Sequence, residues 1–401
     1  MNTPNAYLVS GLRTPVGRYG GALSSVRPDD LAALTIRAVV EDSGINPSVV
    51  DEVILGNANG AGEENRNVAR MAWLLNDYPD TVPGITVNRL CASGMSAITL
   101  AANMVKSGEA DVVIAGGVES MSRAPWVQEK PTKPFAKPGE IFDTSIGWRF
   151  TNPAFRERDK ATYSMPETAE EVARVKGISR AAADAFAVES QDRAIAAMEA
   201  GRFDTEIVPV EVRDRKGNVT VVDTDEGPRP GTTAEVLARL RPVVKGGEVV
   251  TAGNASSLND GASAILVVSE RAAEKYGLKT RARVIAGANA GVAPEIMGMG
   301  PVPATRKVLE RADWDVAELD AVELNEAFAT QSLACLRELG LDPSKVNAWG
   351  GAIALGHPLG SSGSRITITL LNRLEQEDGT RGVATLCVGV GQGSAIAIER
   401  V

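Results

Sequence analysis

The sequence predicts an α/β protein built from two similar halves with a loop-rich segment inserted between them. Three observations carry this prediction. Strand-like and helix-like segments alternate in the first and last thirds of the 401 residues, whereas prolines break the middle third. Two distant segments also share one pattern, in which a Val-Asn pair leads through a Ser-Gly turn into a helix. Such alternation predicts a parallel or mixed sheet with helices on its faces.

The first third shows the alternation most clearly. Residues 29–44 are expected to form a helix because Asp29 and Asp30 suit its first turn and Gly44 suits its end. A second helix is expected to end at Gly108, since apolar residues recur at helical spacing before it. The expected strands of this part are 6–12, 51–58, 84–90 and 110–117, and its expected helices are 29–44 and 91–108.

A segment of different character follows at about residues 124–258. Its start carries too many prolines for regular elements: Pro125, Pro131, Pro134 and Pro138. A long polar helix is expected from about Ser179 to Ala200, with Ser179 as its N-cap and Gly201 after its end. Residues 213–227 are expected to form a hairpin around a Lys-Gly-Asn turn.

The strand–helix pattern resumes at about residue 259 and repeats the first third. VNAWGG, SGSRITITLLNRL and CVGVGQG follow one another as VNRL, ASGMSAITL and VVIAGG do earlier. Two packed copies of one unit also explain why the chain needs no linker. We therefore expect an N-terminal half at 1–123, an inserted loop domain at 124–258 and a C-terminal half at 259–401.

Composition excludes several classes of function. The chain has 42 Lys and Arg against 51 Asp and Glu, a formal net charge of −9, and only 4% aromatic residues. A nucleic-acid-binding protein would show a basic stripe or aromatic stacking platform, so this class is excluded. A single histidine excludes His-rich metal sites and any mechanism that needs two imidazoles.

The cysteines and the chain termini predict a cytoplasmic protein. Cys91, Cys335 and Cys387 are an odd number and lie far apart, which does not make a disulfide framework. The start of the sequence lacks the basic and apolar segments of a signal peptide. No apolar run is long enough to span a membrane, so no membrane partner is expected.

Cys91 lies where an apolar strand meets a helix. The partial positive charge at a helix N-terminus stabilises an anion, so a cysteine at this place can have a lowered pKa and act as a nucleophile. The alternative is a small buried residue that fills the corner between strand and helix.

His357 lies in the segment GGAIALGHPLGSSG. Its glycines and Pro358 indicate a tight loop in which the backbone approaches another group closely. A histidine between Gly and Pro is expected to be aimed at a partner, and a structural role is the alternative.

Cys387 and Asn325 are further candidates. Cys387 ends an apolar strand before glycines whose amide groups, that of Gly389 among them, can bind an oxyanion. The alternative is a buried strand cysteine. Asn325 lies at a strand-to-helix transition, where helix capping is the simpler interpretation.

Cys335 falls in line with Leu339 on a helix and is expected in the core. No metal site is expected, since no CxxC pair exists.

Taken together, these segments resemble the thiolase family of acyl-CoA C-acyltransferases along essentially the whole chain. NRLCASGMSAI, ESMSRAP, TAGNASSLNDGA, LNEAFA, GGAIALGHPLGSSG and CVGVGQG stand in the family's order. The closer likeness, carried by GEENRNVARMA, DTSIGWRFTNP and YSMPETAEEVA, is to 3-oxoadipyl-CoA (β-ketoadipyl-CoA) thiolases. Ser164 before Met165, where many acetoacetyl-CoA thiolases have His, fits this group. The resemblance implies a five-layered αβαβα fold whose inserted domain binds CoA and the acyl group.

The resemblance also implies roles for individual residues. Cys91 would take the acyl group, His357 would draw its proton, and Cys387 would be the second acid and base. Asn325 would hold a water in one oxyanion hole, while the N–H groups of Cys91 and Gly389 would form the other. The remaining implied contacts are to CoA and the acyl group: Ser256 to pantetheine, Arg229 to the nucleotide, and Met165, Met297 and Phe328 to the acyl chain.

The implied reaction is reversible cleavage of 3-oxoadipyl-CoA to succinyl-CoA and acetyl-CoA by ping-pong turnover. Coenzyme A would be a substrate, with no permanently bound cofactor, and the protein would be a homotetramer. A buried terminal carboxylate of the acyl chain needs a cationic partner, for which Arg149 is the first candidate and Arg66 the second. The alternatives are an acetoacetyl-CoA thiolase, a Cys-His-Asn condensing enzyme and a non-catalytic acyl-CoA carrier.

Overall fold

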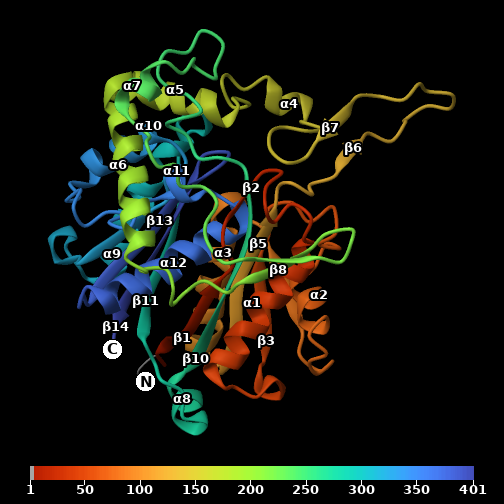
Figure 1. Cartoon of the computed structure of the whole chain (residues 1–401), viewed down its shortest axis with the longest axis vertical. Helices are drawn as coiled ribbons and strands as arrows, with labels where there is room; N and C mark the ends of the chain where they lie inside the picture. Colours follow the sequence, from red (N-terminus) through yellow and green to blue (C-terminus); the bar gives the residue numbers. More distant parts are fainter. Residues whose placement is uncertain (1–3) are drawn as a thin grey trace.

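The computed structural model describes residues 4–401, so the first three residues of the expected N-terminal half lie outside it. A single mixed sheet of ten strands runs through the molecule (Figure 1). Its order is β12-β13-β14-β11-β1-β10-β5-β3-β4, and β2 pairs with β10. The strands are β1 (Ala6–Arg13), β2 (Gly17–Arg18), β3 (Glu52–Gly56), β4 (Gly84–Val87), β5 (Val112–Ser120), β10 (Asn259–Ser269), β11 (Ala282–Gly291), β12 (Ala321–Leu324), β13 (Arg381–Val388) and β14 (Gln392–Arg400).

The two halves of this sheet meet at a short antiparallel contact. Tyr7 and Leu8 of β1 pair with Arg283 and Ala282 of β11. The strand β10, however, pairs with β1 and β5 and therefore lies in the first half of the sheet. We had placed the start of the C-terminal half at residue 259, the first residue of this strand. The pairing leads us to propose that the second half begins after β10, because a strand belongs with the neighbours that satisfy its backbone hydrogen bonds.

Helices complete the five expected layers. The first outer layer holds α1 (Pro28–Ser43) and α2 (Val68–Leu74), and the other holds α9 (Pro301–Ala312) and α10 (Ala329–Leu339). Between the two halves of the sheet, α3 (Ser93–Ser107) packs against α12 (Leu359–Gln376) (Figure 1). Nearly every residue of α12 is buried, as expected for a helix with sheet on two sides. The fold is therefore the αβαβα arrangement.

Three apolar cores hold these layers together. The central core joins Met95 of α3 and Leu370 of α12 to strands of both halves. The outer cores pack Ile36 of α1 against the first half of the sheet and Val308 of α9 against the second. The expected helices 29–44 and 91–108 are confirmed within two residues, with Gly44 and Gly108 in left-handed conformation at their C-caps.

The inserted segment contains the polar helix that the sequence predicts. This helix, α6 (Arg180–Glu199), is capped by the Ser179 hydroxyl oxygen, which accepts a hydrogen bond from the N–H of Ala182. The predicted hairpin forms from β8 (Val210–Arg213) and β9 (Val219–Val222). The other short helices along the chain are η1 (Pro47–Val49), η2 (Leu90–Ala92), α4 (Pro153–Arg156), α5 (Met165–Lys176), α7 (Ala234–Ala238), α8 (Glu270–Tyr276), η3 (Pro294–Met299), η4 (Val316–Glu318) and α11 (Ala352–Leu355).

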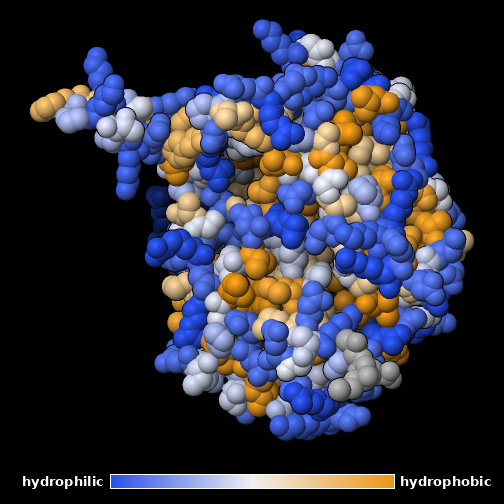
Figure 2. Space-filling view, turned by 180° about the vertical axis from the view of Figure 1, so that it is seen from behind, coloured by the Kyte–Doolittle hydropathy of each residue, from blue (hydrophilic) through white to orange (hydrophobic). Residues whose placement is uncertain are grey.

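The proline-rich stretch contains regular structure that we did not predict. Strands β6 (Trp126–Gln128) and β7 (Ile141–Asp143) pair across it; Pro131, Pro134 and Pro138 lie in the loop between them, and Pro125 directly precedes β6. The two strands and their loop, residues 126–143, form an arm that extends beyond the body of the molecule (Figures 1 and 2). Trp126, Phe135 and Ile141 are exposed on it.

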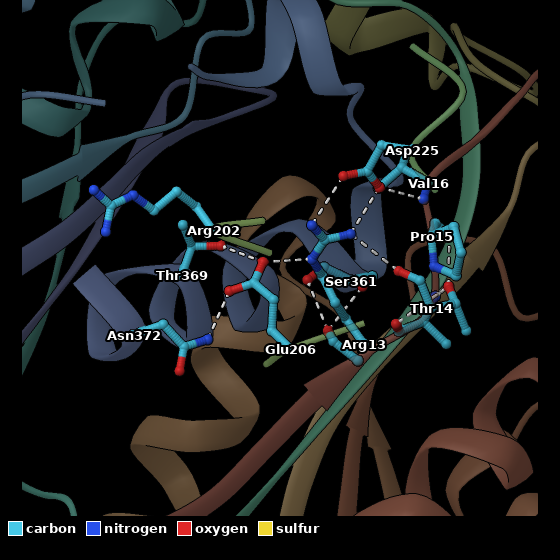
Figure 3. Close-up of polar contacts among 12 residues, drawn as sticks. Arg13, Thr14, Pro15, Val16, Arg202, Glu206, Asp225, Ser361, Thr369 and Asn372 are labelled. Carbon is cyan, nitrogen blue, oxygen red and sulfur yellow. Dashed lines mark hydrogen bonds and ion pairs between the residues drawn. The ribbon is translucent and has the colours of Figure 1, made fainter. Parts of the chain in front are cut away.

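A buried arginine fastens the insert to the core sheet. Arg13, the last residue of β1, is 1% exposed, and its Nε lies 2.7 Å from Oε1 of Glu206. Its Nη1 lies 2.7 Å from Oδ1 of Asp225, which also accepts the N–H of Val16 (Figure 3). Glu206 and Asp225 both belong to the insert, so this ion-paired cluster fixes two of its segments against β1.

Candidate active site

One large cavity brings together the chemically interesting residues of both halves. It has a volume of about 670 Å³, which is typical of a small-molecule site. Most of the site residues predicted from the sequence line it: Cys91, Met165, Ser256, Met297, Phe328, His357, Cys387, Gly389 and Arg149. Asn325 lies behind His357, in contact with its ring. Arg66 and Arg229 are both exposed and do not line the cavity.

Cys91 reaches the cavity from a tight turn between β4 and α3. The turn is the 3₁₀ helix η2, and Leu90 in it has a φ of 46°. We expected the N-terminus of the following helix to lower the thiol pKa, and the surroundings of Cys91 contradict this expectation. Burial raises the pKa of Cys91 to about 11, while the backbone N–H groups of Gly389 and Cys91 offset only part of the effect. The resting thiol is therefore protonated at neutral pH.

His357 is held as a neutral base by its surroundings. The ring Nδ1 lies 2.6 Å from Oγ of Ser362, and that hydroxyl donates its own proton to the carbonyl of Pro358 at 2.9 Å. The hydroxyl can therefore only accept from the ring, which puts the ring proton on Nδ1 and leaves Nε2 unprotonated, as the acceptor that faces the Nδ2 of Asn325 at 3.4 Å. Burial, followed by the charge of Arg365, lowers the pKa of His357 to about 3.

Asn325 does not cap a helix. The helix α10 begins four residues later, at Ala329, and Phe328 occupies its N-cap position. Instead, the Nδ2 of Asn325 lies 3.4 Å from Nε2 of His357. Its Oδ1 is buried and has no hydrogen-bond partner among the described residues. A buried acceptor without a partner indicates a place for a water or ligand group.

The other two cysteines differ in position. Cys387, the last residue but one of β13, is buried and lines the cavity, and its pKa lies well above the ordinary value because of burial and then the nearby Cys91. Cys335 lies in the core of α10, as expected, and its thiol donates to the carbonyl of Gly298 at 3.3 Å. The cavity therefore contains two thiols and one imidazole.

Sequence reasoning missed three polar residues of the site, namely Ser362, Glu119 and Asn59. Ser362 orients the imidazole from the first turn of α12. Glu119 lines the cavity, and its carboxylate accepts the N–H groups of Ala58, Asn59 and Gly360 at 2.9, 3.2 and 2.8 Å. Burial raises the pKa of Glu119 to about 7. Their only sequence signal was their place in the segments ESMSRAP, ANG and GSSG, which revealed no partners.

No helix of the described residues is both long and apolar enough to cross a membrane. Within residues 4–401, moreover, no three His, Cys, Asp or Glu side chains are grouped so that they could hold a metal ion.

Known proteins are similar to this chain along nearly its whole length. The family described as thiolase, N-terminal domain, matches residues 6–271, and thiolase, C-terminal domain, matches residues 278–400. The chain is 58% identical to a beta-ketoadipyl-CoA thiolase of Pseudomonas aeruginosa over 98% of this chain and 99% of that protein. It is 53% identical to a 3-oxoadipyl-CoA/3-oxo-5,6-dehydrosuberyl-CoA thiolase of Escherichia coli over 99% of both proteins. The solved acetyl-CoA acetyltransferase of Bacillus anthracis has a TM-score of 0.93 and 42% identity, covering 100% of this chain and 99% of its own.

Proposed function

The chain belongs to the thiolase family, and on this premise we propose that it cleaves 3-oxoadipyl-CoA with coenzyme A to give succinyl-CoA and acetyl-CoA. As a thiolase it is an acyltransferase that acts on CoA thioesters. One observation supports the dicarboxylic substrate most directly: Arg149, a cation, lines the same cavity as the Cys91 thiol.

In the first half-reaction, Cys91 attacks the C3 carbonyl carbon of the substrate. His357 takes the thiol proton on Nε2, the ring nitrogen that carries no proton because Nδ1 donates to Ser362. The C2–C3 bond then breaks, and its electron pair stays on C2 of the departing acetyl-CoA. The Cys387 thiol protonates that carbon, so acetyl-CoA leaves and a succinyl thioester remains on Cys91.

In the second half-reaction, coenzyme A releases the succinyl group. The Cys387 thiolate takes the proton of the CoA thiol, and the CoA sulfur attacks the succinyl-Cys91 carbonyl. The thioester bond to Cys91 breaks, and the Cys91 sulfur recovers its proton from His357. A thiol suits both steps because it is a nucleophile and a leaving group.

Two sets of donors stabilise the oxyanions of these steps. The protonated Nε2 of His357 forms the first set with a water held by Asn325, whose partnerless Oδ1 supports this role. The backbone N–H groups of Cys91 and Gly389, which both act on the Cys91 thiol, form the second. Each donor is typically worth about 3 kcal/mol of barrier.

The protein needs no permanently bound cofactor. Its substrate-binding residues form two groups, one for the acyl chain and one for the CoA moiety. Met165, Met297 and Phe328 contact the acyl chain, and Ser256 contacts pantetheine. Their shared place on the cavity wall supports these assignments. Arg229, exposed on the insert, receives the nucleotide end of CoA where it leaves the cavity. The insert would thus bind CoA and the acyl group.

We further propose a cytoplasmic homotetramer. The exposed apolar residues Trp126, Phe135 and Ile141 on the arm support a surface that other copies cover. Light scattering on the purified protein tests the mass, and a monomer would contradict it.

Thiolysis of a panel of 3-oxoacyl-CoAs tests the substrate. We expect 3-oxoadipyl-CoA to give the largest kcat/KM, and a larger value for acetoacetyl-CoA would favour the alternative activity. Replacing Arg149 by Ala should reduce thiolysis of 3-oxoadipyl-CoA more than that of acetoacetyl-CoA, and equal losses would contradict its role. Intact-mass detection of an acetyl adduct on Cys91 separates an active enzyme from an inert acyl-CoA carrier.

A further inference from the structure

Asn59 follows strand β3 and connects the catalytic core to the segment of the insert that carries Arg149. Its side-chain Nδ2 donates to the Thr144 carbonyl at 3.2 Å and to the Thr144 hydroxyl oxygen at 2.8 Å. Its Oδ1 accepts a hydrogen bond from Nη2 of Arg149 at 3.3 Å. Because a carbonyl can only accept, Thr144 fixes the orientation of this amide, and the oxygen must face Arg149.

The partner that Asn59 gives to Arg149 is neutral. No ion pair within residues 4–401 includes Arg149, whereas the buried Arg13 is held by two carboxylates. A carboxylate partner would orient the guanidinium and also cancel its charge. An amide oxygen orients the guanidinium through one N–H and leaves the positive charge and the other N–H donors for a ligand.

The rest of the cavity wall does not compensate this charge. Among residues 4–401, Glu119 is the one acidic residue that lines the cavity. Its two oxygens already accept three backbone N–H groups, including that of Asn59, and it forms no ion pair with Arg149 among the described residues. Most of the remaining wall is apolar, which strengthens the attraction between a cation and an anion within it.

We propose that Asn59 is a specificity-determining residue, which positions Arg149 while keeping its charge available to the terminal carboxylate of the acyl chain. The inference rests on the proposed cleavage of 3-oxoadipyl-CoA and deepens it. Asn59 itself is a positioning residue, because it acts on the substrate through Arg149.

The test compares 3-oxoadipyl-CoA with 3-oxohexanoyl-CoA, which has the same chain length and a methyl group in place of the carboxylate. The measured quantity is the ratio of kcat/KM for the two substrates. In Asn59→Asp, a carboxylate of the same size pairs with Arg149, so we expect the ratio to fall at least about tenfold, mainly through a higher KM for 3-oxoadipyl-CoA. In Asn59→Ala, the arginine is loosened but keeps its charge, and the ratio should fall less.

A larger fall of the kcat/KM ratio in Asn59→Asp than in Asn59→Ala distinguishes an effect on the charge of Arg149 from a merely structural role of Asn59. Equal ratios in Asn59→Asp and Asn59→Ala, or a wild-type ratio in either, would overturn the inference. Asn46→Asp is the matched control, since it makes the same change at an exposed position that lines neither the cavity nor the hollow beside Arg149, and it should keep the wild-type ratio. Should Asn59→Asp fail to fold, a wild-type ratio in Asn59→Ala still overturns the inference, and a reduced ratio supports it.

Arg149→Met distinguishes failure of this inference from failure of the proposed function. A wild-type enzyme without preference for 3-oxoadipyl-CoA, together with an unchanged ratio in Arg149→Met, would overturn the proposed substrate and this inference with it. A reduced ratio in Arg149→Met beside unchanged ratios in the Asn59 variants would overturn this inference alone.

Discussion

Ser362 accepts a hydrogen bond from the Nδ1 of His357 at 2.6 Å, and this contact decides which ring nitrogen faces the cavity. The serine proton is already given to the carbonyl of Pro358, so the direction of the contact is fixed. The orientation of the His357 ring thus depends on a residue of the first turn of α12.

Replacing Ser362 by Ala should therefore impair catalysis. Without an acceptor for Nδ1–H the imidazole can change tautomer or rotate, and we expect kcat to fall by roughly 100-fold, within the range of general base catalysis. Ser362→Thr, which keeps the hydroxyl, should restore most of the rate. Ser361→Ala is the control, because that buried hydroxyl contacts Ser263 and not the histidine. A normal kcat in Ser362→Ala would contradict the assigned tautomer.

The raised pKa of Cys91 predicts slow alkylation at neutral pH. With a pKa of about 11, only about one thiol in ten thousand is ionised at pH 7. The thiolate fraction grows about tenfold for each pH unit below the pKa, so the rate of reaction with iodoacetamide should keep rising from about pH 7 to pH 10. Stopped-flow or mass-spectrometric rates would check this, with Cys91→Ser giving the background of the buried cysteines. A plateau below about pH 8 would indicate a lowered pKa.

Asn325 should contribute to the transition state more than to binding. Its Oδ1 has no partner among the described residues, and its Nδ2 lies next to Nε2 of His357. Removing both atoms in Asn325→Ala should lower kcat about 100- to 1,000-fold, as for other oxyanion-hole residues, with little change in KM for CoA. A large rise in KM with normal kcat would assign the residue to substrate binding instead.

The side chains that we propose to react could be singled out in the sequence because their types are rare in this chain. With one histidine and three cysteines, the assignment of Cys91, His357 and Cys387 needed only their Gly-rich surroundings and the resemblance. Residues that act through others left no such signal. Ser362 is one of several serines at the start of α12. Its contact with His357 depends on how α12 meets the loop that precedes it.

The partners of a strand within the sheet could not be predicted from local sequence patterns either. The apolar run of β10 indicates a strand but not the sheet half that it joins, because the pattern of one strand does not identify its partners. For Cys91, the sequence shows only the effect of the adjacent helix α3, whose N-terminus would lower the thiol pKa. The larger effect is burial by segments distant in the sequence, which raises the pKa.

The Arg13 cluster predicts a stability effect far from the cavity. In Arg13→Met, the carboxylates of Glu206 and Asp225 stay buried without their cation, and breaking a buried ion pair in this way typically costs about 3 to 5 kcal/mol. Thermal unfolding should therefore shift by several degrees. Arg271→Met is the matched control, because the side chain of Arg271 is 73% exposed in its pair with Asp111 and such pairs contribute about 0 to 1 kcal/mol.

Glu206 keeps hydrogen bonds from Thr369 and Asn372, whereas Asp225 keeps only a backbone N–H, so the segment around Asp225 should become accessible to protease first. Equal shifts in the two arginine variants would mean that the cluster does not fasten the insert.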